Sequence, residues 1–145
     1  MPTLGTMTVV GLIAAAALVW FFLRNRRQDQ LSGILEKRRS SSTLVTRADY
    51  VESLEKMPVA LALTADSFYY ENPELEASFD LKRIDEIEYD DELATGRAIP
   101  AGSRALRLRS HGATFEFILS SDDAAKWKNA LPPRRLDQSP VAQAH

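Results

Sequence analysis

Three arginines are clustered in one segment, where their guanidinium groups could bind an anion such as a lipid phosphate. They are Arg104, Arg107 and Arg109, and they are interleaved with Leu106 and Leu108. This alternation is typical of a strand whose leucines face a core and whose arginines face solvent. We favour the interpretation that the arginines pair with nearby acids on a solvated face. A lipid-headgroup site on these three residues remains the alternative.

An acidic run precedes the arginines and could be imagined as a cation site. Its spacing does not match the alternating ligands, central glycine and closing glutamate of a calcium-binding loop. Ile87 and Tyr89 interrupt the acids as inward-facing strand residues do. We therefore interpret this stretch as a strand edge running into an irregular segment over 90–103; its acids are Asp85, Glu86, Glu88, Asp90, Asp91 and Glu92.

The residue types needed for catalysis are scarce. The chain has two histidines and no cysteine, and its six glycines are scattered. His111 stands beside Gly112 in a turn and His145 is the last residue, so neither is placed near a nucleophile. We expect no enzyme activity, catalytic residue, cofactor, metal site or small-molecule substrate.

The uncharged residues up to Leu23 predict a transmembrane helix over 4–23. Eighteen residues rise about 27 Å as a helix, close to a hydrocarbon core of about 30 Å. Trp20, Phe21 and Phe22 stand at the expected depth of the membrane interface. A cleaved signal peptide is disfavoured because no basic residue precedes the apolar run.

Basic residues follow the apolar run, which predicts an outside N-terminus and a cytoplasmic domain at the cell membrane. Residues 24–39 hold six basic and two acidic side chains, whereas residues 40–145 hold twelve and eighteen. The acidic domain disfavours nucleic acid as a partner, and alone it should bind anionic lipid weakly. The juxtamembrane basic residues are Arg24, Arg26, Arg27, Lys37, Arg38 and Arg39.

A basic juxtamembrane linker is expected over 24–45. Most of its residues are too polar to bury, but Leu31, Ile34 and Leu35 could form one apolar helical stripe. We expect this stripe to be a frayed continuation of the membrane helix rather than a recognition helix.

After the linker, apolar and polar residues alternate in several short segments, as they do in strands. Residues 46–57 fit either a helix or a first strand, and both readings stay open. Pairs of strands joined by short turns are expected at 59–71 and 106–119, with further short strands at 77–81 and 84–89. Ser120 begins a helix that Pro132 ends, and residues 133–145 are expected to be a disordered tail.

These elements resemble the pleckstrin-homology (PH) superfold, particularly its GRAM-like and bacterial PH-like branch. The likeness covers 46–132 and rests on Leu63-Thr64 before Phe68-Tyr69-Tyr70, on Phe79-Asp80-Leu81 before Ile84, Ile87 and Tyr89, and on the 120–131 helix with Trp127. It implies an α+β domain, a PH-like antiparallel barrel or sandwich of six to seven strands closed by a C-terminal helix. The expected core residues are Phe68, Tyr70, Phe79, Leu106, Leu108, Phe115, Phe117, Trp127 and Leu131.

Phosphoinositide-binding PH domains are similar to one another in a basic cluster near the loop between their first two strands. Here the turn after Leu63 offers Ala65 and Asp66 instead. We therefore expect a membrane-anchored, noncatalytic interaction module that tethers a protein partner through sheet edges, the 90–103 loop or the outer face of the last helix. A headgroup-sensing domain is the alternative, and an enzyme or accessory subunit of a membrane enzyme is a weaker one.

Overall fold

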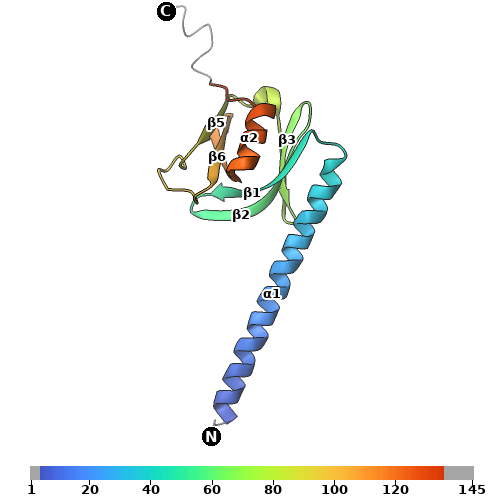
Figure 1. Cartoon of the computed structure of the whole chain (residues 1–145), viewed down its shortest axis with the longest axis vertical. Coiled ribbons are helices and arrows are strands. Elements are labelled where there is room, and N and C mark those ends of the chain that lie inside the picture. The colour runs from blue at the N-terminus through green and yellow to red at the C-terminus, as the bar shows by residue number, and fades with distance from the viewer. Residues whose placement is uncertain (1–3, 136–145) are drawn as a thin grey trace, which may run out of the picture.

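The computed structural model describes residues 4–135, which form one long helix and a β-rich domain (Figure 1). Helix α1 spans Leu4–Arg39 and projects away from the domain. The elements that follow are β1 (Leu44–Glu52), β2 (Glu55–Leu63), β3 (Ser67–Asn72), β4 (Leu75–Asp80), a 3-10 helix (Leu81–Arg83), β5 (Glu86–Asp90), β6 (Ser103–Ser110), β7 (Ala113–Ser120) and α2 (Ser121–Ala130).

The strands form a seven-stranded antiparallel sheet in the order β4-β3-β2-β1-β7-β6-β5. Two hairpin series, β1 to β4 and β5 to β7, are joined where β1 pairs with β7 through Tyr50 and Phe117. The sheet is open, since β4 and β5 are its two edge strands. The expected α+β class is thereby confirmed.

Helix α2 packs into the curved sheet and completes the core. Ser120 caps it by accepting a hydrogen bond from the backbone amide of Asp123 at 3.2 Å. Trp127 is fully buried, with its ring 5.5 Å from that of Phe68. Seven of the nine expected core residues are buried, while Phe79 and Phe115 are partly buried against them. On the helix, Ala124, Trp127 and Leu131 face inward and Lys128 is exposed.

The ambiguous segment 46–57 belongs to strands rather than a helix. Strands β1 and β2 pair along their whole length, from Leu44 with Leu63 to Glu52 with Glu55. The turn between them places Ser53 at a φ of 56° and leaves Leu54 exposed. The strand expected over 77–81 starts earlier, and its last residue, Leu81, lies in the 3-10 helix.

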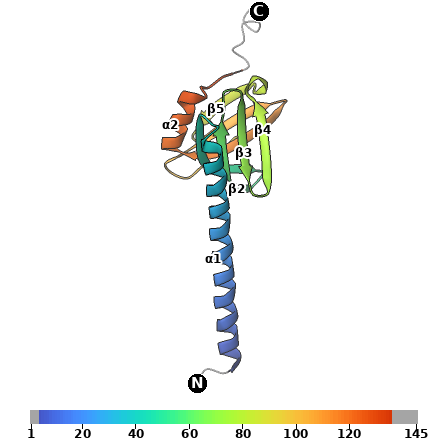
Figure 2. The ribbon, with the colours of Figure 1, turned by 90° about the vertical axis from the view of Figure 1, so that its right-hand side faces the viewer.

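The frayed continuation expected after residue 23 is wrong, because α1 runs without interruption to Arg39. Leu31 and Leu35 are buried, and they pack against Ala60 of β2 together with Ile34 and Val45. The C-terminal part of α1 meets the domain at β1, β2 and β3, as Figure 2 shows from the side of β2 and β3. The stripe is neither frayed nor free for a partner, since burial on the chain's own sheet stabilises the helix.

The expected disorder of 133–145 is wrong at its start. Arg134 and Ile87 exchange backbone hydrogen bonds of 2.8 and 2.9 Å, so the chain after α2 lies along the edge of β5. The Arg134 guanidinium also donates to the carbonyl oxygens of Ile84 and Leu81, at 2.6 and 3.1 Å. These bonds satisfy edge groups that would otherwise be unpaired. The tail expected at 136–145 lies outside the described residues.

Candidate functional site

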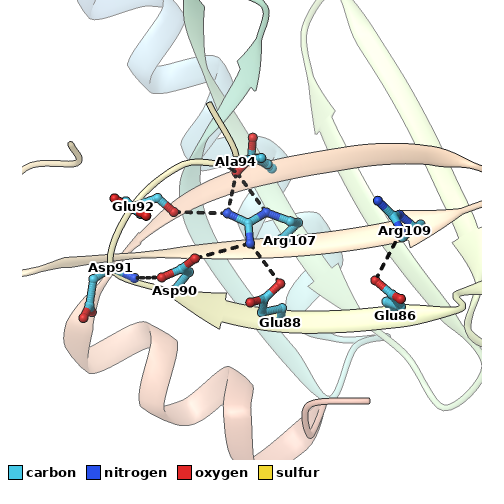
Figure 3. Close-up of polar contacts among 9 residues, drawn as sticks. Glu86, Glu88, Asp90, Asp91, Glu92, Ala94, Arg107 and Arg109 are labelled. Atoms are coloured by element: carbon cyan, nitrogen blue, oxygen red, sulfur yellow. Dashed lines mark hydrogen bonds and ion pairs between the residues drawn. The ribbon is translucent and has the colours of Figure 1, made fainter. Parts of the chain in front are cut away.

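Strand β6 places Arg107 at the centre of a cluster of acids (Figure 3). Its guanidinium lies 2.9 Å from Glu88, 3.4 Å from Asp90 and 3.2 Å from Glu116. It also donates to the backbone carbonyl oxygen of Glu92 at 3.1 Å. The strand register explains the cluster, since Arg107 is the cross-strand neighbour of both Glu88 on β5 and Glu116 on β7.

The other two arginines of the candidate lipid site are paired as well. Arg104 lies 2.5 Å from Asp91, and Arg109 lies 3.7 Å from Glu86. All three guanidinium groups therefore have carboxylate partners. A phosphate would have to displace these carboxylates, and that opposes binding at this face.

The ionic contacts alter the proton affinity of two groups. Burial disfavours the charge of Arg107, but hydrogen bonds and attraction from Glu88 and Glu116 outweigh it and raise the Arg107 pKa. The amide of Asp91 donates to the Asp90 carboxylate at 2.7 Å and, together with Arg107, lowers the pKa of Asp90. Both groups are therefore held in their charged forms at neutral pH.

A hollow of about 320 Å³ lies over this cluster. Four carboxylates and two guanidiniums line it, those of Glu86, Glu88, Asp90, Glu92, Arg107 and Arg109. The loop beside it is anchored, because Leu93 is buried against Ala105 and Ile118 and the amide of Ala94 donates to Glu116 at 2.9 Å. The net charge of the hollow is negative, so its electrostatics favour a positively charged group over a phosphate.

The described residues contain little that could support catalysis. His111 is exposed in the β6–β7 turn at a φ of 52°, and His145 lies outside the described range. Within residues 4–135, no group of three or more His, Cys, Asp or Glu side chains is arranged to hold a metal ion.

The contact between α1 and the sheet is a feature that the sequence did not reveal. Arg38 lies 2.6 Å from Glu71 on β3 and 3.4 Å from Glu76 on β4, and its guanidinium stacks 4.3 Å above the ring of Tyr69. The hydrogen bond that Arg38 donates to the Glu71 carboxylate raises the pKa of Arg38. Arg47 of β1 donates to Ser32 of α1. Apolar packing and charge-assisted bonds together hold α1 to β1, β2, β3 and β4.

The remaining juxtamembrane basic residues are divided between two environments. Arg39 lies 3.4 Å from Glu36 on the exposed side of α1, and Lys37 is exposed. Arg24, Arg26 and Arg27 form no ion pair with a carboxylate of residues 4–135, and Arg24 lies 5.4 Å from the centre of the Trp20 ring. The charges of Arg24, Arg26 and Arg27 are therefore not neutralised by ion pairs within residues 4–135, whereas Arg38 is bound to the domain.

Helix α1 is long and apolar enough to span a membrane, and its apolar part is exposed. The architecture of the described residues is compatible with a PH-like fold. A scan against protein-family models found no match, and a search of curated proteins found no significant relative.

Proposed function

We propose that this protein is a single-pass membrane protein that holds a PH-like domain, of the GRAM-like or bacterial PH-like kind, at the membrane surface to recruit a protein partner. The observation that carries the proposal is the continuity of α1. One helix of 36 residues contains both the apolar segment and the segment docked on the sheet through Leu31, Leu35 and Arg38.

This continuity supports a fixed height and a fixed orientation of the domain at the membrane. Leu31 is eight residues beyond Leu23, which corresponds to about 12 Å along a helix axis. The domain therefore lies next to the headgroup layer, and the same surfaces of the domain always face toward and away from the membrane. Confinement near the bilayer raises its effective concentration for other membrane-associated proteins without requiring high intrinsic affinity.

Several surfaces of the domain are free to meet a partner. The edge strand β4 carries no further strand within residues 4–135, and it could be extended by a strand from another protein. The acidic hollow beside the 91–102 loop suits a basic segment, and the outer face of α2 is exposed. The ion pairs of Arg104, Arg107 and Arg109 argue against the headgroup-sensing alternative, and no constellation described above supports an enzyme.

The positive-inside pattern favours a domain on the cytoplasmic side of the membrane. A phosphatase fused after the C-terminus of the full chain tests this, because it is active only outside the cytoplasmic membrane. We expect an inactive fusion, with the protein in the membrane fraction. An active fusion would overturn the topology.

Crosslinking in native membranes tests recruitment. We compare the full chain with a chimera carrying an unrelated span in place of residues 4–23, and with a soluble form starting at Gln28. We expect the chimera to capture the same partner as the full chain and the soluble form to capture much less. Equal capture by the soluble form would show that tethering is not the mechanism.

A further inference from the structure

A groove lies where α1 leaves the domain. One wall is formed by α1 between Trp20 and Leu31, and the other by the start of β2 and the β3–β4 turn. Its volume is about 570 Å³, within the range of about 300–1,000 Å³ typical of ligand sites. It is distinct from the Arg107 hollow on β5 and β6.

The two walls of the groove differ in chemistry, and the α1 wall changes from apolar to basic along the helix. Trp20 and Leu23 form its membrane-proximal end, and Arg24 and Arg27 follow one turn further along the helix. Residues three apart share a helix face, so both guanidiniums belong to the same wall. The opposite wall is mainly apolar, with Met57, Pro58 and Pro73, and carries one carboxylate, that of Glu74.

The depth of the groove fits the phospholipid headgroup layer. This step rests on the proposed function, since it assumes that α1 spans the bilayer. Arg24 and Arg27 lie about 1.5–6 Å beyond Leu23 along the axis. The headgroup layer of one leaflet is about 5–7.5 Å thick, since a core of about 30 Å lies in a bilayer of about 40–45 Å. Lipid phosphates are therefore at the height of these guanidiniums.

The charges of the groove suit an anionic lipid. The guanidiniums of Arg24 and Arg27 are free of ion pairs within residues 4–135, unlike those of Arg38, Arg104, Arg107 and Arg109. With Glu74, the groove carries a net charge of +1, counted as two guanidiniums and one carboxylate. Gln28 adds a polar group that can bond to headgroup hydroxyls. The side chain of Asn72 is bonded to Met57, Pro58 and the amide of Glu74 and shapes the opposite wall.

We propose that this groove binds one anionic glycerophospholipid from the surrounding leaflet. Its phosphate lies against Arg24 and Arg27, its acyl chains descend past Leu23 and Trp20, and its headgroup extends toward Glu74. The bound lipid fills the gap between helix and domain and strengthens the fixed orientation of the domain.

Quenching of Trp20 fluorescence by brominated lipids tests the proposal on the full chain in lipid nanodiscs. Trp20 and Trp127 are the two tryptophans of the chain, and Trp127 is fully buried in the core. Brominated phosphatidylglycerol and brominated phosphatidylcholine are titrated separately into a phosphatidylcholine background. We expect the anionic lipid to be preferred at Trp20 by at least about fivefold, which corresponds to about 1 kcal/mol for one basic residue near a membrane.

Charge variants distinguish binding of a lipid in the groove from a general electrostatic attraction between the basic residues and anionic lipids. Arg24→Gln with Arg27→Gln should abolish the preference, and Glu74→Gln should increase it. Arg26→Gln is the control, because Arg26 has the same charge and lies between Arg24 and Arg27 along the helix but does not line the groove. Two results would overturn lipid binding in the groove while leaving the membrane span intact. One is a loss of preference in Arg26→Gln as large as in the double variant, and the other is equal quenching by the two lipids in the unaltered chain. Quenching by neither lipid would overturn the span, and the groove with it.

Discussion

The guanidinium of Arg38, in the last turn of α1, lies 2.6 Å from the carboxylate of Glu71 on β3. Their side chains are 22% and 13% exposed, so the pair is largely shielded from water. The same guanidinium stacks on Tyr69, which fixes its position further. A residue expected to lie in a basic linker is therefore part of the joint that holds the domain to the helix.

A double-mutant cycle measures the strength of this joint. In a soluble fragment of residues 28–135, Arg38→Met and Glu71→Gln should each lower the free energy of unfolding. We expect a coupling energy of about 1–2 kcal/mol between them, as for hydrogen bonds between charged groups that are partly buried. The exposed pair Arg39 and Glu36 is the control, with an expected coupling of about 0.2–0.5 kcal/mol. Similar coupling energies for the two pairs would argue against a special role for Arg38.

The docked half of α1 should stabilise the domain even without a membrane. A fragment of residues 28–135 is expected to unfold at higher urea concentration than one of residues 43–135, because Leu31 and Leu35 bury apolar area on Ala60. The expected difference is at least about 2 kcal/mol. Leu31→Ala with Leu35→Ala should remove most of it, whereas Lys37→Ala, at an exposed position, should not. Equal midpoints for the two fragments would show that the helix adds nothing to the domain.

Trp127 is expected to be the most sensitive core position tested by substitution. Trp127→Ala should cost about 3–5 kcal/mol in the free energy of unfolding, since the indole is fully buried between α2 and the sheet. Trp127→Phe should cost clearly less, because the indole N–H has no hydrogen-bond partner within residues 4–135 and phenylalanine loses no bond there. The exposed neighbour Lys126→Ala is the control. An unchanged urea midpoint for Trp127→Ala would mean that α2 does not close the core.

Removing the charge of Arg107 should destabilise the domain in a pH-dependent way. Arg107→Met leaves Glu88, Asp90 and Glu116 without their shared cation, and we expect a loss of about 1–3 kcal/mol at pH 7. The folded pKa of Asp90 is lowered, so its stabilising contribution is present above the unfolded pKa of about 3.9 and is lost as the pH falls through the folded pKa. The loss of unfolding free energy caused by Arg107→Met should therefore become smaller at acid pH.

Urea unfolding of Arg107→Met and of the unaltered domain, measured from about pH 7 down to about pH 3, tests this pH dependence. Arg109→Met is the matched control, because that guanidinium is 51% exposed and contacts one carboxylate at 3.7 Å. It should cost no more than about 1 kcal/mol, with little dependence on pH. A penalty for Arg107→Met that stays constant down to pH 3 would contradict an ionic origin.

Short-range patterns predicted most elements of the fold. Alternation located β2, β3, β6 and β7, and the Ser120 cap located α2. Residues 46–57 were ambiguous because Tyr50, Leu54 and Met57 also fit a helical period. In the structure β1 pairs with β2 across a turn at Ser53 and with β7 on its other side. The turn depends on one unusual φ, and the β7 pairing is distant in the sequence, so neither could be seen in the local pattern.

The contacts between elements could not be predicted from the sequence. The stripe of Leu31 and Leu35 indicated a helix, but its partner Ala60 looked like an outward-facing residue of a strand. Small residues on both sides of Leu61 were the available signal that another element approaches closely. The alternation of leucines and arginines around Arg107 indicated an outward face with acidic neighbours. The ion pair of Arg107 with Glu116, however, depends on the β6–β7 register. The groove beside Arg24 depends on the placement of two whole elements.

A distance measurement across the joint tests the central claim most directly. The chain has no cysteine, so single cysteines at Asn25 on α1 and Lys126 on α2, both exposed, can carry spin labels in the full chain in lipid nanodiscs. We predict one narrow distance distribution, which broadens when Leu31→Asp and Arg38→Ala undock the helix. A broad distribution with several maxima in the unaltered chain would show that the domain swings freely on its anchor, and would contradict a helix that fixes its orientation at the membrane.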